Sequence, residues 1–422
     1  MKFKSSNLLL ILSLSLSLGA ASAFAHGEKM DVKMDEGEAA RARIEKYIST
    51  RDDKEADEIL EHILSHPILN IDQILIQLKR WKRYEEEKKG PLFDQKLAIG
   101  SGDIKYALYV PEGYSSQIAY PLIVCLHGAG FDGNRYLERW SARLGESYIV
   151  LCPSVEGGTW WTDEAASQVI SLIEDVKERY NIDTNRIFLT GMSNGGVGAL
   201  RIGIYFPDRF AGVAPMAGAM PVEAMPFLKN LKNTPVYIIH GSKDQVMPVE
   251  YSRKISNRLQ DLGYDVVYKE HDMVHPQAGG HFFPAEELPE LIKWLGGKRR
   301  DPYPKELTFR VSGTGRRGYY WVTIDEMEEG KEGNKSRVLF TSIETKVIDG
   351  NRIEVKSEKV KTYTLFLNDK IVDLSKDVTI VTNGKVSFEG HIKKDPSILL
   401  KDARSRQDRE MLFPATITIK VD

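Results

Sequence analysis

The stretch FLTGMSNGG, residues 188–196, decides the fold of this chain, because it places one serine where a strand would turn sharply into a helix. Residues 187–190 form a short apolar, β-branched run that is typical of a buried parallel strand, and residues 197–204 carry apolar side chains at helical spacing. Glycines lie two positions before and two positions after Ser193, where a Cβ would collide with the neighbouring strand and helix. The pattern predicts a nucleophile elbow, with a plain glycine-rich turn as the alternative.

Strand and helix patterns alternate on both sides of this stretch. Strand-like runs occupy residues 104–110, 121–126, 148–152, 212–217, 236–240 and 266–268, and helical patterns occupy residues 165–180, 249–262 and 285–295. This alternation over about two hundred residues predicts an α/β domain, with a mostly parallel sheet covered by helices on both faces. In such sheets the catalytic groups lie at the carboxyl ends of the strands.

The serine needs a base and a carboxylate, and both follow it in the chain. A serine hydroxyl is a poor nucleophile unless an imidazole accepts its proton, and a carboxylate must orient that imidazole. Asp244 follows the strand at 236–240, and His281 lies on the loop after the next strand, beside a Gly-Gly pair that allows a tight bend. The order serine, aspartate, histidine is that of the α/β-hydrolase triad. We therefore predict Ser193, Asp244 and His281 as catalytic residues.

Two alternatives stay open on the same loop. His275 is the second candidate for the base, and Asp272 is the second candidate for the carboxylate. His271 comes directly after the strand, and we expect a structural role for it.

The segment LHGAG, residues 126–130, ends another predicted strand with a glycine-rich bend. Backbone N–H groups in such a bend can stabilise the oxyanion of an acyl-transfer intermediate. We predict the amides of Ala129 and Asn194 as the oxyanion donors and His127 as a structural residue. On the loop after the strand at 148–152, Trp160 and Trp161 are predicted to wall the substrate pocket, although one of two adjacent tryptophans should pack inward.

These motifs give residues 94–300 a resemblance to known enzymes. The region resembles secreted α/β-hydrolase esterases of the feruloyl esterase, acetylxylan esterase and polyhydroxyalkanoate depolymerase-like group. Its GMSNGG and HGSKD segments are also similar to the prolyl oligopeptidase-type hydrolase domain. The resemblance implies an α/β-hydrolase fold. It also implies the roles already given, which are a catalytic triad of Ser193, Asp244 and His281 and oxyanion donors at Ala129 and Asn194.

The same resemblance implies hydrolysis of carboxylic esters through an acyl-enzyme, without a metal or an organic cofactor. A feruloyl or acetyl ester linked to a polysaccharide is the first expectation for the substrate. A polyester or small ester, and then a peptide bond, are the alternatives. The non-enzymatic alternative is a catalytically inactive hydrolase domain that serves as a binding protein.

The first residues predict export. Lys2 and Lys4 precede an apolar run at 8–18 and the sequence Ala-Phe-Ala at 23–25, which together make a secretory signal cleaved after Ala25. We expect a secreted or periplasmic protein with no stable membrane anchor. The net charge of −2 over 422 residues gives no reason to expect nucleic-acid binding.

The flanking regions predict two further parts. Charged amphipathic helices are expected within residues 26–90, either supporting the catalytic domain or covering its mouth. The predicted organisation is a signal peptide at 1–25, a helical extension at 26–90, a catalytic domain at 91–300, a linker at 301–306 and a β-rich domain at 307–422.

In the last domain, strand-forming runs separated by turn residues predict a small antiparallel sandwich. Tyr319, Tyr320 and Trp321 are interpreted as core or interdomain packing, with a sugar-binding face as the alternative. In the catalytic domain, Cys125 and Cys152 are interpreted as buried small hydrophobes, with a disulfide as the alternative.

Overall fold

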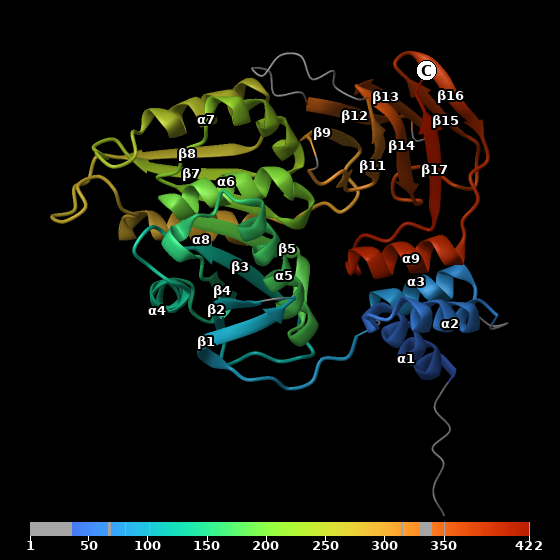
Figure 1. Cartoon of the computed structure of the whole chain (residues 1–422), viewed down its shortest axis with the longest axis horizontal. Helices are drawn as coiled ribbons and strands as arrows, with labels where there is room; N and C mark the ends of the chain where they lie inside the picture. The colour runs from blue at the N-terminus through green and yellow to red at the C-terminus, as the bar shows by residue number, and fades with distance from the viewer. Residues whose placement is uncertain are drawn as a thin grey trace, which may run out of the picture.

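The structure is a computed structural model that describes residues 36–65, 69–80, 82–100, 102–313, 315–328, 340–349 and 351–421. The predicted signal peptide at 1–25 lies outside the described residues. The chain forms a central α/β domain, a β-rich domain beside it and a cluster of helices below the β-rich domain (Figure 1). No helix in these ranges is long and apolar enough to cross a membrane.

The central domain is built on an eight-stranded sheet in the order β1-β2-β4-β3-β5-β6-β7-β8. β2 runs antiparallel to both of its neighbours, β1 and β4. The six strands β3 to β8 run parallel to one another. The strands are β1 (Gly90–Ile99), β2 (Gly102–Val110), β3 (Tyr120–Leu126), β4 (Ile149–Pro153), β5 (Ile182–Met192), β6 (Gly212–Met216), β7 (Val236–Gly241) and β8 (Val266–His271).

Side chains of the central strands alternate between two apolar layers, so both faces of the sheet need cover. On β3, Leu122 and Val124 join the core under α5 (Asp163–Arg179) and α6 (Asn194–Tyr205). Ile123 joins the opposite core.

That opposite core is covered by α4 (Gly133–Leu144) and α8 (Leu288–Gly297). α7 (Glu250–Asp261) packs with α6 at the β7 end of the first face. The predicted α/β-hydrolase fold, a mostly parallel sheet flanked by helices, is confirmed.

Cys125 on β3 and Cys152 on β4 both point into the second layer and are fully buried free thiols. Burial, and then a hydrogen bond with Cys152, raises the pKa of the Cys125 thiol well above its usual value. The two cysteines therefore act as small apolar core residues.

The β-rich domain contains two sheets that share one core, as a sandwich requires. One sheet is β10-β11-β14-β17 and the other is β16-β15-β13-β12-β9. The strands are β9 (Glu306–Ser312), β10 (Gly318–Tyr319), β11 (Val322–Met327), β12 (Phe340–Ile348), β13 (Arg352–Glu358), β14 (Val360–Leu367), β15 (Val378–Thr382), β16 (Lys385–Gly390) and β17 (Ala415–Lys420). The predicted sandwich is confirmed; its described strand pairs are antiparallel except for β13 and β15, which pair in parallel.

Tyr319, Tyr320 and Trp321 are buried in the core of this sandwich. The indole N–H of Trp321 donates to the Pro304 carbonyl at 2.8 Å. The sugar-binding alternative for these rings is therefore wrong, and the packing interpretation holds.

The N-terminal helices are α1 (Glu36–Ser49), α2 (Asp53–Leu64) and α3 (Ile71–Lys79). Their apolar faces pack against α9 (Pro396–Arg406) of the C-terminal segment, through Leu399, Leu400 and Ala403 (Figure 1). Among the described residues, the apolar core of these three helices includes no residue of the catalytic sheet, so the helices pack on the C-terminal segment instead. The segment that follows them does reach the end of α5, where the Tyr180 hydroxyl donates to the Lys88 carbonyl at 2.9 Å.

Buried ion pairs join the central domain to the β-rich domain. Arg300 binds Asp408 at 2.8 Å, and both side chains are almost completely buried. Asp208, fully buried, accepts from Arg316 at 2.7 Å. Burial would raise the pKa of Asp208, but Arg316 outweighs it and lowers that pKa to about 2. These two ion pairs, one on each side of the predicted linker at 301–306, fix the central domain to the β-rich domain.

We expect Arg316→Ala to destabilise the folded protein by about 3–5 kcal/mol, because it leaves the Asp208 carboxylate buried without its main partner. The matched control is Lys376→Ala, which removes an exposed partner of Asp373 and should leave the unfolding midpoint almost unchanged. Urea unfolding of both variants measures the difference. Equal midpoints for the two variants would show that the interdomain ion pair contributes little.

Candidate active site

Ser193 lies at the junction between β5 and α6, with φ 60° and ψ −122°. This left-handed conformation is strained for a residue with a side chain, and such strain concentrates at functional positions. A Cβ on Gly195 would lie 2.0 Å from the Leu126 carbonyl oxygen, and one on Gly191 would lie 2.3 Å from the Gly195 carbonyl oxygen. Both glycines are therefore sterically required, as the sequence predicts.

Asp244 and His281 come together from two different loops. Oδ2 of Asp244 lies 2.6 Å from Nδ1 of His281, and Oδ1 accepts the N–H groups of Val246 at 2.8 Å and Met247 at 2.9 Å. Burial would raise the pKa of Asp244, but the N–H of Met247, the His281 ring and the N–H of Val246 outweigh it and lower that pKa. The carboxylate is thus held ionised where it can orient the imidazole.

The glycine pair before His281 has the steric role that the sequence suggests. A Cβ on Gly280 would lie 2.4 Å from the carbonyl carbon of Lys243, so only glycine lets this loop pass against the turn that carries Asp244. Gly279 has φ 57°, a conformation that favours glycine.

The alternative residues do not take these places. Asp272 is exposed, whereas Asp244 is buried and bonded to His281. His275 lines a cavity that Ser193 and His281 also line. Its Nδ1, however, accepts the N–H of Gln277 at 3.2 Å, and no described carboxylate contacts its ring. His271 is buried, and its Nε2 lies 3.2 Å from the Phe282 carbonyl, as a structural histidine would.

His240 contacts the candidate carboxylate, although sequence reasoning gave it no role. Its Nε2 lies 2.8 Å from the Met247 carbonyl and 3.2 Å from Oδ2 of Asp244, and its Nδ1 lies 2.7 Å from the Ser252 hydroxyl. Burial lowers the pKa of His240, so the ring is neutral and can donate only from one nitrogen. The signal in the sequence was its place in HGSKD, where only the aspartate was interpreted.

The bend after β3 runs over Ser193. A Cβ on Gly128 would lie 3.5 Å from Cβ of Ser193. Within the described part of the chain, the N–H groups of Ala129 and Asn194 have no hydrogen-bond acceptor, so both are free to bind an oxyanion. His127 is buried and holds the bend, with Nδ1 2.9 Å from the Gly128 carbonyl and Nε2 accepting from Val155 at 3.2 Å.

The tryptophans do not form the predicted pocket wall. Trp160 is fully buried, and its indole N–H donates to the His127 carbonyl at 2.7 Å, so it supports the bend from inside. Trp161 is 44% exposed, and neither ring lines the cavity beside Ser193. The prediction of substrate binding by Trp160 is therefore wrong, and the structure gives Trp161 no place in that cavity.

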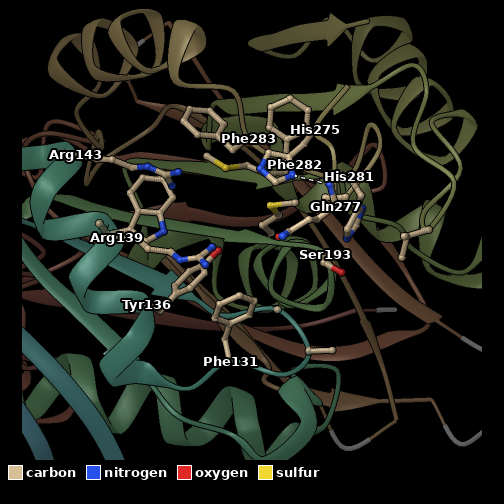
Figure 2. A pocket seen from close by; sticks show the side chains of 17 residues that line it. Phe131, Tyr136, Arg139, Arg143, Ser193, His275, Gln277, His281, Phe282 and Phe283 are labelled. Carbon is tan, nitrogen blue, oxygen red and sulfur yellow. Dashed lines mark hydrogen bonds between the residues drawn. The ribbon is translucent and has the colours of Figure 1, made fainter. Parts of the chain in front are cut away.

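A cavity of about 740 Å³ contains both Ser193 and His281 on its surface (Figure 2). Five aromatic side chains contribute to its wall: Phe131, Tyr136, Trp140, Phe282 and Phe283. The Ser193 hydroxyl has no hydrogen-bond partner among the described residues, as is common for catalytic hydrogen bonds before substrate binds. Across the described ranges, no group of three or more His, Cys, Asp or Glu side chains could hold a metal ion.

Residues 160–295 match the family model described as phospholipase/carboxylesterase. The chain is 29% identical over 164 residues to the bifunctional acetylxylan esterase/xylanase XynS20E of Neocallimastix patriciarum, covering 36% of this chain and 23% of that protein. It is 28% identical over 167 residues to a probable feruloyl esterase C of Aspergillus terreus, covering 37% of this chain and 60% of that protein.

Among solved structures, a thermostable esterase is 28% identical with a TM-score of 0.42, covering 49% of this chain and 62% of that one. This chain matches the two relatives from Neocallimastix patriciarum and Aspergillus terreus over less than two thirds of their own length. The central domain of this chain has the α/β-hydrolase fold, and part of it is similar in sequence to carboxylesterases, including a probable feruloyl esterase and a bifunctional acetylxylan esterase/xylanase.

Proposed function

We propose that this protein hydrolyses carboxylic esters through an acyl-enzyme formed on Ser193. The observation that carries the proposal is the arrangement around one cavity. Ser193 at a strained turn and His281 bonded to Asp244 both line it, and they are far apart in the sequence. A nucleophile, a base and a carboxylate that orients the base are the parts that acyl transfer to a serine requires.

In the proposed reaction, Nε2 of His281 accepts the hydroxyl proton of Ser193 while Oγ attacks the ester carbonyl carbon. The N–H groups of Ala129 and Asn194 stabilise the resulting oxyanion. Collapse of the tetrahedral intermediate breaks the bond to the alcohol oxygen, which receives the proton from His281. A water molecule then attacks the acyl-enzyme with His281 again as base, releasing the acid and restoring Ser193.

For the substrate we propose a feruloyl or acetyl ester linked to a polysaccharide. An aromatic wall suits a flat aryl acyl group, and the relatives include a feruloyl esterase and an acetylxylan esterase by name. A small or polymeric aliphatic ester is the second proposal. The pattern of residues 1–25 supports the further proposal that the protein is secreted or periplasmic.

A substrate panel tests the reaction class. We expect p-nitrophenyl acetate and methyl ferulate to be hydrolysed, and acetylated or feruloylated xylan to release acid. We expect little cleavage of proline-type peptide anilides, because an amine is the poorer leaving group and a peptide needs a groove that holds an extended chain. The value of kcat/KM for each substrate measures the preference. An anilide cleaved as fast as the esters would replace the esterase proposal with a peptidase.

A further inference from the structure

Two arginines lie on the wall of the cavity across from Ser193. Arg139 and Arg143 are four residues apart on α4, and therefore on one face of the helix. Figure 2 shows them on the opposite side of the cavity from Ser193 and His281. α4 is held close to the sheet, because a Cβ on Gly133 at its start would lie 2.2 Å from the Cys152 carbonyl oxygen. The backbone that carries the two arginines is therefore held in place against the sheet.

Neither guanidinium has a carboxylate partner in the described part of the chain, and no aspartate or glutamate lines this cavity. Both are instead positioned by aromatic rings. Arg139 lies 4.4 Å from the centre of the Phe131 ring, and Arg143 lies 5.2 Å from the centres of Trp140 and Phe283. Ring contacts orient a guanidinium but leave its charge and its hydrogen-bond donors unused.

The charge of Arg143 is also partly removed from water. Its side chain is half-buried, and this burial is the main cause that lowers the pKa of Arg143; Tyr136 opposes the shift and Arg139 adds to it. An unpaired, partly desolvated cation costs free energy unless an anion binds beside it. A planar guanidinium can bind a carboxylate through two parallel hydrogen bonds, so Arg139 and Arg143 give this wall of the cavity the charge and the donors that an anion requires.

We propose that Arg139 and Arg143 select esters that carry a carboxylate or a similar anion a few bonds away from the scissile carbonyl. This inference rests on the proposed ester hydrolysis and narrows its substrate class. The anion belongs either to the acyl part, as in a monoester of a dicarboxylic acid, or to the alcohol part, as in an ester of a hydroxy acid. Both present the same carboxylate to the arginines.

Two matched substrate pairs separate these sources. Mono(4-nitrophenyl) terephthalate and 4-nitrophenyl 4-carbamoylbenzoate differ only by a carboxylate or its neutral amide in the acyl part. 4-Carboxyphenyl acetate and 4-carbamoylphenyl acetate differ in the same way in the alcohol part. We expect kcat/KM to favour the anionic member of at least one pair by about tenfold or more, as charge-assisted hydrogen bonds allow. The preferred pair identifies which part carries the anion.

Variants link that preference to the two arginines. R139Q and R143Q should each reduce the ratio of anionic to neutral kcat/KM, and the double variant should bring it near one. R143K keeps a charge and should keep part of the ratio. R135Q removes the same charge from an exposed position of α4 outside the cavity, and its ratio should stay that of the original protein. Because each ratio is taken within one variant, a folding defect lowers both rates alike.

Added salt should also reduce the ratio in the unaltered protein, since it screens the exposed Arg139. Hydrolysis without a preference for either anionic substrate would overturn this inference alone. A preference that survives in the double variant, or that R135Q removes equally, would overturn it as well. Absence of hydrolysis of every ester would overturn the proposed function, and this inference would fall with it.

Discussion

Ser193→Ala is expected to reduce ester turnover by on the order of a thousandfold or more while leaving the fold intact. The substitution removes only the hydroxyl group, which forms no hydrogen bond to any described residue, so no hydrogen bond of the described fold is lost. The backbone strain at φ 60° is borne by alanine as it is by serine. The measurement is kcat on p-nitrophenyl acetate for variants with matching circular dichroism and thermal unfolding.

Ser167→Ala is the matched control, because it makes the same change on α5, at an exposed residue whose hydroxyl donates only to the Asp163 carbonyl. Its turnover should stay within about twofold of the original, as surface substitutions cause little change. A folded Ser193→Ala protein that keeps a tenth of the turnover would mean that another residue is the nucleophile.

His281→Ala is expected to lower kcat by on the order of a thousandfold or more, because no other described side chain that lines the cavity is hydrogen-bonded to a carboxylate that orients it. His275→Ala is the matched control on the same loop and should retain most of the turnover. The same assay on both folded variants gives the comparison. An inactive His275→Ala beside an active His281→Ala would transfer the role of base to His275.

The turn that carries the candidate nucleophile could be predicted because short-range sterics determine it. Gly191 and Gly195 are needed for contacts within the elbow and with the end of β3, so the strand-Ser-helix pattern is sufficient to expect the turn. Asp244 and His281 follow later strands of the same parallel sheet, and the carboxyl ends of those strands meet at one edge, so both residues can be expected near Ser193. The parallel sheet could be predicted because strand and helix patterns alternate along the sequence.

Other features depend on contacts between distant segments, which no local pattern encodes. The sequence pattern does not predict α9, and its packing with α1, α2 and α3 joins residues more than three hundred positions apart. The position of Trp160 after a strand predicts a place at the pocket, yet its indole N–H donates to the His127 carbonyl and the ring is buried. The connection after Arg300 has linker composition, but a partner from the far end of the chain buries that arginine.

The arginine face of α4 was likewise invisible in the sequence. Arg139 and Arg143 have the spacing of any solvated helix face, and only the tertiary structure shows aromatic rings and Ser193 around the same cavity. Local patterns could therefore suggest where the chemistry occurs, whereas the substrate preference depends on which side chains the fold gathers opposite the nucleophile.

The most direct measurement of the central claim is the site of covalent labelling by a fluorophosphonate, which reacts with activated serines. Intact mass and peptide mapping should show one adduct, on the peptide that contains Ser193, and Ser193→Ala should show none. Labelling should be slowed by a competing ester and greatly reduced in His281→Ala, because the hydroxyl then lacks its base. A folded protein that hydrolyses esters but shows no adduct at Ser193, or an adduct on a different serine, would contradict the proposed acyl-enzyme.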